Sequence, residues 1–281
     1  MDLKEIYPPR EKWTHKGKNG YLLVIAGSKK YTGSPIFNAL AALRAGADLV
    51  CCLGPERATN IAAQFLPDII TFPLVGDYLR KKHLPFILKQ IPKFDSLILG
   101  CGLGRSLETF QVVLEIIKKA NLPMVIEADG IRALSQEKEK ISSILKEKKI
   151  VLTPHSKEFE ILTGEKLTTE IGERKEKVKK WAKKLNCLIL LKGHLDVISD
   201  GQEVFLNETG SPFMTKGGFG DILTGILGAI LARKVNLFEA AKAASFINGQ
   251  AGQLAAEKYG EGLLASDSFE IISQVIKNYA K

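Results

Sequence analysis

Apolar residues along the chain fall into short continuous runs, separated by longer stretches in which apolar and charged positions repeat with helical spacing. The short runs are rich in Leu, Ile and Val and end at glycine, proline or polar residues, as buried strands do. They predict strands at 21–26, 49–53, 96–99, 124–128, 150–152 and 188–191. Because these runs are almost continuously apolar, we expect a sheet that is buried on both faces.

The intervening stretches predict helices. These helices cover 34–45, 56–65 and 107–120, and the C-terminal part adds 221–232, 237–258 and 267–279. We expect Ser34 to be the N-cap of the first helix and Pro35 its first residue, where the missing amide of proline costs nothing. Residues 196–199 and 203–206 predict a hairpin that turns at Asp200-Gly201.

Strands that alternate with helices predict an α/β fold of three layers, with a mostly parallel central sheet and helices on both faces. The 281 residues include no long Pro/Gly/Ser linker, no low-complexity tract and no repeat of fixed period. We therefore expect a single domain over 1–281, in which residues 1–12 form an N-terminal extension.

The net charge of +9 raises the question of a nucleic-acid partner. The basic residues gather in stretches such as 172–186, where Glu173 and Glu176 alternate with them, as on a solvated helix face. No basic run carries the interleaved aromatic residues that stack on bases, so we expect no nucleic-acid partner. A modest positive field would still help to collect anionic small molecules.

The N-terminus lacks the basic start and apolar stretch of a secretory signal. The longest apolar segment, 222–232, is shorter than the about 20 residues that a membrane span needs. We expect a cytoplasmic protein with no membrane partner. The cysteines, whose spacing suits neither a disulfide nor a metal site, are predicted to be buried reduced thiols: Cys51, Cys52, Cys101 and Cys187.

Glycines and polar residues gather where the predicted strands end. They are Gly27-Ser28, Gly100 to Gly104, Asp129-Gly130, Thr153-Pro154-His155 and Lys192-Gly193-His194. Ligands of open α/β sheets bind beyond the carboxyl ends of the strands. The sequence therefore predicts one long site along one edge of the sheet, without saying what fills it.

The segment from Lys216 to Asp221 has the most specific pattern. Gly217, Gly218 and Gly220 permit positive φ angles and close backbone approach. A helix predicted to begin at Asp221 would point its free amides and its dipole at an anion in front of the turn. A carboxylate there can accept a proton from a hydroxyl while the amides neutralise a transferred phosphoryl group. We predict a phosphate-handling turn with Asp221 as general base; the alternative is a plain loop with an aspartate N-cap.

Two common nucleotide signatures are missing from the sequence. It contains no Gly-x-x-x-x-Gly-Lys-Ser/Thr, which excludes a P-loop enzyme. The glycines at 100, 102 and 104 follow a strand but lack the Gly-x-Gly-x-x-Gly spacing of dinucleotide-binding folds.

The order of these motifs resembles the ribokinase-like family of ADP/ATP-dependent NAD(P)H-hydrate dehydratases. The matching stretches are His15-Lys16-Gly17, Ala26-Gly27-Ser28 with Tyr31 to Pro35, Gly100 to Gly104, Ala128-Asp129, Leu152 to His155 with Glu158, Leu191 to Gly193, Asn207, and Lys216 to Gly225. They cover roughly residues 13–275, and the ordered set is far more specific than any one motif. We expect a stand-alone dehydratase domain without the epimerase domain that some members carry.

The resemblance implies a hydro-lyase that repairs a damaged cofactor. In the family, ADP or ATP phosphorylates the hydroxyl at C6 of the hydrated nicotinamide ring, and elimination of phosphate restores NADH or NADPH. Asp221 matches the catalytic aspartate. Ser34, Gly102 and His155 match positions that hold the hydrate together with Asp221.

The resemblance also implies where the adenine nucleotide binds. Two segments match its contacts: Lys192, Gly193, His194, Leu195 and Asp196 on one side, and Gly217, Gly218 and Gly220 in the turn. Neither segment tells ADP from ATP as the donor. Mg²⁺ is implied by phosphoryl transfer, yet we find no dedicated metal-ligand cluster in the sequence.

The chain departs from the family pattern at four places. Phe219 stands where the family has Thr, Cys101 where it has Pro, Glu127 where it has Asp, and Ser156-Lys157 where it has Pro-Gly. None of these changes removes a charged catalytic group, but Phe219 removes a hydroxyl from the turn.

Alternative roles remain for several residues. His155 is alternatively a helix-capping histidine, Glu158 a first-turn helix acid and Asp129 a turn former. A small-molecule kinase of the same fold, such as a hydroxyethylthiazole kinase, would use the same turn and aspartate. A nucleotide-binding regulator without turnover is a third hypothesis.

Family analogy also implies a homo-oligomer, such as a tetramer. The alanine-rich helices at 222–232 and 240–256 would then be buried either between subunits or in the core.

Overall fold

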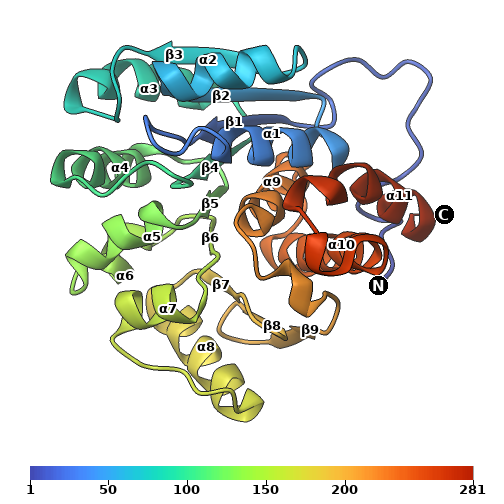
Figure 1. Ribbon diagram of the computed structural model, residues 1–281. Helices are drawn as coiled ribbons and strands as arrows, with labels where there is room; N and C mark the ends of the chain where they lie inside the picture. Colours follow the sequence, from blue (N-terminus) through green and yellow to red (C-terminus); the bar gives the residue numbers. More distant parts are fainter. Residues whose placement is uncertain (281) are drawn as a thin grey trace.

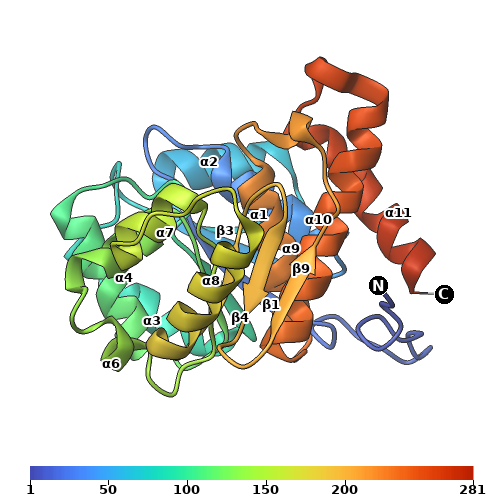
Figure 2. The same cartoon turned by 90° about the horizontal axis from the view of Figure 1, so that it is seen from below.

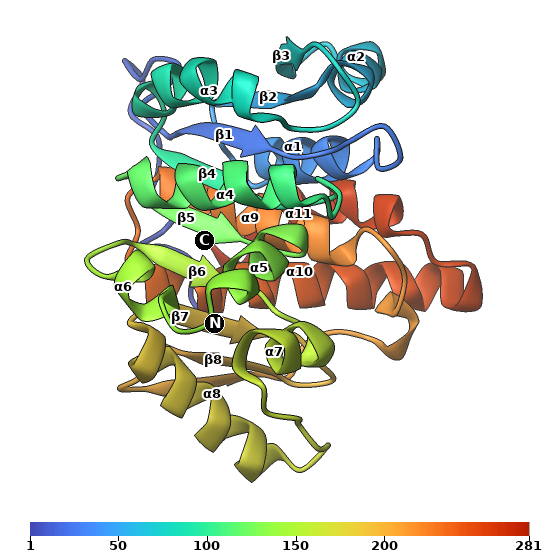
Figure 3. The same cartoon turned by 90° about the vertical axis from the view of Figure 1, so that its left-hand side faces the viewer.

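The computed structural model describes residues 1–280 and contains a nine-stranded sheet between two layers of helices (Figure 1). The strands are β1 (Tyr21–Ile25), β2 (Leu49–Pro55), β3 (Ile70–Leu74), β4 (Ser96–Leu99), β5 (Met124–Ile126), β6 (Ile150–Leu152), β7 (Leu188–Leu191), β8 (Asp196–Ser199) and β9 (Val204–Asn207). Their order is β3-β2-β1-β4-β5-β6-β7-β8-β9, and Figure 3 shows them one above the other. β1 to β7 pair in parallel, whereas β8 and β9 are added antiparallel. The predicted three-layer, mostly parallel α/β fold is confirmed.

Helices connect the strands and cover both faces of the sheet. They are α1 (Ser34–Arg44), α2 (Glu56–Phe65), α3 (Leu84–Gln90), α4 (Leu107–Lys119), α5 (Asp129–Leu134), α6 (Ile141–Leu145), α7 (Ser156–Thr163), α8 (Ile171–Leu185), α9 (Phe219–Ala232), α10 (Leu237–Tyr259) and α11 (Phe269–Tyr279). In Figure 1, α1, α9, α10 and α11 lie on one side of the sheet, and α4 to α8 lie on the other. None of the helices in the described part of the chain has the length and apolar character of a bilayer span.

Apolar residues on the two faces of the sheet form two separate cores. Successive side chains of a strand point to opposite faces. Leu22 therefore packs with the α1, α9, α10 and α11 layer, whereas Leu23 packs with the opposite layer. The same alternation separates Cys51 from Cys52, and all four cysteines are free and buried, as predicted.

The alanine-rich helices α9 and α10 bury their alanines within the chain itself. Their alanines join the core beneath the sheet, from Ala229 in α9 to Ala255 in α10. Of the two predicted locations, between subunits or in the core, the structure shows burial in the core.

Two predicted helix starts are wrong by a short distance. Ser34 is the first residue of α1 rather than its cap; the N-cap is Gly33, and no side chain caps this helix. α9 begins at Phe219 rather than Asp221, because Gly218 takes a φ of 107° that ends the preceding turn. β3 lies outside the strand prediction, since it is an edge strand with a proline and only its last residue is buried.

The two ends of the chain lie close together, as Figure 2 shows. The Leu3 amide donates a hydrogen bond of 3.0 Å to the Tyr279 carbonyl, and the Leu3 side chain is buried in the core. The segment 1–12 is therefore packed against the domain at its start. Whether it acts as a separate extension remains a prediction.

Candidate active site

The glycine turn before α9 lies against residues that follow β5 and β7. A Cβ atom on Gly220 would lie 2.7 Å from Glu127 Oε1 and 3.3 Å from Lys192 Nζ. Glu127 comes directly after β5 and Lys192 directly after β7. Glycine at position 220 therefore lets the start of α9 approach this pair of charges. The parallel strands bring the predicted glycine and polar segments to one edge of the sheet.

Gly218 has a strict steric requirement for glycine. Its φ of 107° is unfavourable for other residues, and a Cβ there would lie 2.8 Å from Ala265 Cβ and 3.1 Å from Phe37 Cζ. No side chain caps the first amides of α9 in the described structure. These amides and the helix dipole are therefore available to an anion in front of the turn.

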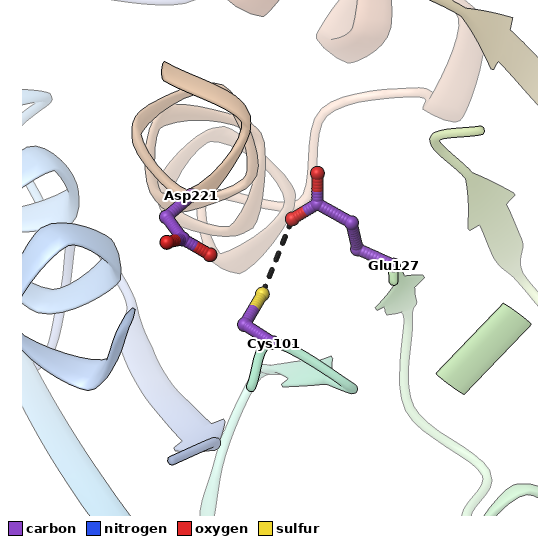
Figure 4. A group of neighbouring side chains, drawn as sticks. All are labelled: Cys101, Glu127 and Asp221. Atoms are coloured by element: carbon purple, nitrogen blue, oxygen red, sulfur yellow. Dashed lines mark hydrogen bonds between the residues drawn. The ribbon is translucent and has the colours of Figure 1, made fainter. Parts of the chain in front are cut away.

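Asp221 is the third residue of α9 and shares a small volume with Glu127 and Cys101. Figure 4 shows the three side chains converging from α9, the end of β5 and the loop after β4. The Cys101 sulfur and one carboxylate oxygen from each acid lie within 4.8 Å of one another. This clustering was not predicted, although the acid at a strand end was a signal that could have drawn attention to Glu127.

Burial raises the pKa of Asp221 to about 7, and the negative charge of Glu127 adds to this rise. Interactions with the Cys101 thiol, the Ser34 hydroxyl and the Lys192 ammonium group act in the opposite direction. A carboxylate with a pKa near 7 binds an abstracted proton more tightly than an aspartate with its ordinary pKa does. Asp221 therefore has the acidity of a general base that works near neutral pH.

Glu127 is the residue that connects this cluster. Only 3% exposed, it accepts a hydrogen bond of 2.5 Å from Lys192 Nζ on Oε1. Its Oε2 accepts hydrogen bonds of 3.2 Å each from Cys101 Sγ and Thr224 Oγ1. Burial lowers the pKa of Lys192, but the charges of Glu127 and Glu158 outweigh burial and raise it overall. Lys192 is therefore held as a cation beside Asp221.

Asn38 holds the backbone of Asp221. Its Nδ2 donates to the Asp221 carbonyl at 2.7 Å and to Thr224 Oγ1 at 2.8 Å. Because Asn38 lies on α1, it ties that helix to the first turn of α9. This contact was missed by the sequence analysis, since Asn38 and Asp221 lie far apart in the chain.

Ser34 and Gly102 lie together near Asp221. Gly102 has a φ of 63°, and a Cβ there would lie 3.0 Å from Ser34 Oγ. Three of the four positions predicted to hold the hydrate therefore lie close together: Ser34, Gly102 and Asp221.

His155, the fourth predicted position, is the N-cap of α7. Its Nδ1 accepts hydrogen bonds from the amides of Lys157 and Glu158 at 3.1 and 3.2 Å, and Glu158 Oε2 accepts from the His155 amide at 3.0 Å. Burial lowers the pKa of His155, partly offset by Glu158. The capping roles considered for His155 and Glu158 are thus present in the structure. His155 also pairs with Lys192 in an isolated bridge, which places it beside the cluster.

Asp129 organises the glycine loop after β4. Its Oδ2 accepts from the Gly104 amide at 2.9 Å, and its Oδ1 contacts Arg105 Nε at 3.3 Å. Ala128, between Glu127 and Asp129, has a φ of 47°, which is unusual for a residue with a side chain. The backbone is strained where it presents these two acids.

A cavity of about 810 Å³ opens beside the turn. This volume lies in the range of small-molecule sites. Its walls include most of the residues predicted to bind nucleotide, namely Lys192, Gly193, His194, Asp196 and Gly220, together with His155. Leu195, Gly217 and Gly218 are not among its lining residues.

Asp196 shapes one wall of this cavity. Its Oδ1 accepts from the Gly193 amide at 3.0 Å, and its Oδ2 accepts from Ser245 Oγ at 2.6 Å. Burial raises the pKa of Asp196. The side chain thereby joins the loop after β7 to α10.

The fold and the site define a three-layer α/β domain with a carboxylate in the first turn of the helix that follows a glycine turn. Comparison with known proteins agrees with this class. A family model described as NAD(P)H-hydrate dehydratase matches residues 22–274. The chain belongs to the NAD(P)H-hydrate dehydratase family.

Individual relatives support this assignment. The ADP-dependent (S)-NAD(P)H-hydrate dehydratase of Cenarchaeum symbiosum is 37% identical over 279 residues, which cover 99% of this chain and 96% of that protein. The bifunctional NAD(P)H-hydrate repair enzyme Nnr of Pyrobaculum aerophilum is 42% identical over 267 residues, 94% of this chain but 52% of that protein. The chain thus spans about half the length of the bifunctional relatives.

A solved structure has the same fold. The ADP/ATP-dependent NAD(P)H-hydrate dehydratase of Bacillus subtilis, co-crystallised with ATP and Mg²⁺, superposes with a TM-score of 0.82 at 24% identity. The superposition covers 99% of this chain and 96% of that one.

Proposed function

We propose that this protein restores NADH or NADPH from their hydrated forms, with ADP or ATP as phosphoryl donor. The observation that carries this proposal is the position of Asp221, a carboxylate with a pKa of about 7 in the first turn of α9 beside a nucleotide-sized cavity. Membership of the NAD(P)H-hydrate dehydratase family supplies the substrate class.

In the proposed reaction, Asp221 removes the proton from the C6 hydroxyl of the hydrated nicotinamide ring. The hydroxyl oxygen then forms a bond to the terminal phosphorus, and the bond from phosphorus to the leaving phosphate oxygen breaks. The amides at the start of α9 and the Lys192 ammonium group offset negative charge on the transferred group. Loss of phosphate from C6 and of a proton from the ring restores the double bond.

The substrates are proposed to meet at Asp221 from two sides. Ser34 and Gly102 lie together on one side and support a hydrate site there. On the other side, the cavity is bordered by residues that support a nucleotide site: Lys192, Gly193, His194, Asp196 and Gly220. His155 lines the same cavity and also caps α7.

Mg²⁺ is proposed to arrive with the nucleotide rather than to occupy a protein cage. Mg²⁺ prefers oxygen ligands in octahedral geometry, usually phosphates, waters and one or two carboxylates. In the Cys101, Glu127 and Asp221 group, one ligand is a thiol and both oxygens of Glu127 already accept hydrogen bonds. This group therefore fits Mg²⁺ poorly as a resident ion, whereas MgADP or MgATP fits as a substrate.

We also propose that the protein acts in the cytoplasm as a homo-oligomer. Because the alanines of α9 and α10 are buried within one chain, they are not available for subunit contacts. Light scattering coupled to gel filtration measures the subunit number, and a single-chain mass of 30.9 kDa would contradict the oligomer.

Recovery of absorbance at 340 nm tests the reaction. The protein is incubated with hydrated NADH or NADPH and with ADP or ATP, each with Mg²⁺. Recovery with a nucleotide and none without it is the expected result. No recovery with either nucleotide would contradict the proposal. Phosphorylation of a thiazole alcohol by ATP in a parallel assay would favour the alternative kinase.

A further inference from the structure

One face of α1 contacts the glycine turn and the first turn of α9. Ser34, at the start of α1, interacts with the Asp221 carboxyl group. Phe37 packs against Gly218, where a Cβ atom would lie 3.1 Å from Phe37 Cζ. Asn38, four residues after Ser34, contacts the backbone of Asp221. Because residues three and four apart share one face of a helix, a single side of α1 supports the segment that carries Asp221.

The backbones of α1 and α9 come very close together just after Asp221. α1 packs along α9, as Figure 1 shows. A Cβ on Gly225 would lie 2.4 Å from the backbone carbonyl oxygen of Asn38 and 2.8 Å from Ala41 Cβ. Glycine at position 225 therefore allows this approach. At such a separation, a side chain as short as that of Asn38 reaches the backbone of the neighbouring helix.

The amide nitrogen of Asn38 is directed at one peptide group of α9. Its Nδ2 donates to the Asp221 carbonyl oxygen at 2.7 Å and to Thr224 Oγ1 at 2.8 Å. The Thr224 hydroxyl itself lies 2.9 Å from the same carbonyl oxygen. The two hydrogens of the Asn38 amide group are thus both used to hold the peptide group of Asp221, directly and through Thr224.

The oxygen of the same amide has no comparable role. Asn38 is fully buried, and its Oδ1 atom has no hydrogen-bond partner among residues 1–280. A buried acceptor without a partner is unfavourable for folding, and an apolar side chain of similar size would avoid this cost. The value of asparagine at position 38 therefore lies in its donor, which holds Asp221.

We propose that Asn38 is a positioning residue for Asp221, which keeps the first turn of α9 where the Asp221 carboxylate takes the proton from the substrate hydroxyl. This inference rests on the proposed function, because it takes Asp221 as the general base. Asn38 bonds the peptide carbonyl of Asp221 and so acts through that residue. Displacement of a catalytic group by about 1 Å can reduce a rate about 100-fold, and loss of this contact frees the backbone that carries the group.

Steady-state kinetics of two variants test the inference. Asn38→Leu approximately keeps the size of the side chain and removes the donor. Asn38→Asp keeps the shape and places an acceptor opposite the Asp221 carbonyl. Each variant is expected to lower kcat for nucleotide-dependent recovery of NADH about 10- to 100-fold. The KM for ADP should change little, because Asn38 does not line the cavity beside the turn.

Ser96→Ala is the matched control. Ser96 is buried like Asn38, and its hydroxyl donates to the Gly228 carbonyl of α9 at 2.8 Å. Gly228 lies about two turns beyond Asp221. The control therefore removes a buried hydrogen bond to the same helix, away from the base, and should lower the melting temperature while leaving kcat unchanged. An equal loss of kcat in Ser96→Ala and Asn38→Leu would indicate general loosening of α9 and overturn the inference.

Amide hydrogen exchange followed by mass spectrometry provides a measurement that does not depend on activity. Asn38→Leu should speed exchange in residues 219–225 relative to the rest of the chain, because the first turn of α9 opens more often. Ser96→Ala should not change exchange in that segment relative to the rest. Circular dichroism verifies that each variant is folded, and Asn38→Leu remains informative if the buried charge of Asn38→Asp prevents folding.

The outcomes separate the inference from the proposed function. If the wild type restores NADH and the folded Asn38 variants keep its kcat, the inference is wrong and the proposed function stands. If the wild type restores no NADH with either nucleotide, the proposed function fails. Exchange then decides whether Asn38 holds this turn, and an unchanged rate in residues 219–225 of Asn38→Leu would overturn the inference as well.

Discussion

The Cys101 thiol donates a hydrogen bond of 3.2 Å to Oε2 of Glu127. The resemblance to the family implies a departure at each residue, Pro for Cys101 and Asp for Glu127, and the structure shows that the two side chains touch. Burial, together with the charges of Glu127 and Asp221, raises the pKa of the Cys101 thiol well above its usual range. The thiol therefore stays protonated and acts as a donor to the longer acid.

This contact predicts that the two positions are energetically coupled. Glu127→Asp shortens the acid and draws it away from Lys192 and the thiol, and Cys101→Pro removes the donor. Each single change should lower the free energy of unfolding, whereas the double change should cost less than the sum by about 0.5–3 kcal/mol. Urea unfolding of the four proteins measures this coupling.

Cys187→Ala is the control for that cycle. Cys187 precedes β7 and so lies at the amino ends of the parallel strands, whereas Glu127 follows β5 at their carboxyl ends. The change in the free energy of unfolding caused by Cys187→Ala should add to the change caused by Glu127→Asp. Strict additivity of Cys101→Pro and Glu127→Asp would show that the observed contact has no energetic weight.

Asp221→Asn should abolish most of the catalysis while leaving nucleotide binding in place. Loss of a general base reduces kcat by about 10²- to 10⁴-fold. Recovery of absorbance at 340 nm gives kcat, and calorimetry gives the ADP affinity. Asp68→Asn, at an exposed position, is the control and should behave as wild type. Full activity of Asp221→Asn would favour a nucleotide-binding regulator or a different base.

The rate should rise with pH through the pKa of Asp221, about 7, and level off above it, because the base acts only when deprotonated. The neighbouring charges should move this midpoint in opposite directions. Glu127→Gln removes a negative charge that raises the pKa, so the midpoint should fall. Lys192→Met removes a positive charge that lowers it, so the midpoint should rise, with a higher KM for the nucleotide.

The pH dependence of kcat for the wild type and these two variants provides the measurement. Substrate at saturation separates the midpoint from the change in KM. Midpoints that move in the same direction in both variants would contradict the assignment of the titrating group to Asp221.

Asp221→Asn should also make the protein more stable at alkaline pH. The pKa of Asp221 is raised from 3.8 to about 7, so the folded state binds the proton more tightly than the unfolded state. The wild type therefore loses stability as pH rises between these two values, whereas the neutral amide does not. One pKa unit corresponds to about 1.4 kcal/mol, so the gain at pH 8 should be on the order of 1 kcal/mol or more.

Thermal unfolding at several values between pH 4 and 8 measures that gain. The difference in stability between Asp221→Asn and the wild type should grow as pH rises toward 7 and then remain constant. A stability difference that shrinks as pH rises would contradict the raised pKa.

Much of the architecture follows from local patterns. The apolar runs predict the inner strands, such as 96–99 and 188–191, because a strand buried on both faces requires apolar side chains on both. The glycines before Asp221 predict an anion-binding turn, because positive φ and close approach are properties of glycine itself. The start of α9 was misplaced by two residues, since helix ends depend on the packing of Gly218 as well as on capping preferences.

The chemistry around Asp221 required contacts between distant segments. Glu127 and Lys192 are 65 residues apart, and they meet because β5, β6 and β7 are neighbours in the sheet. The raised pKa of Asp221 comes from burial and from Glu127, neither of which is visible in a local pattern.

Spacing within a segment thus specifies strands, helices and the glycine turn, because backbone geometry depends mainly on near neighbours in the chain. The order of strands specifies which acids, amides and cations come together. That order depends on how whole layers pack, and so the identity of Asp221 as a candidate base was readable from the sequence, while its charged surroundings appeared only in the folded domain.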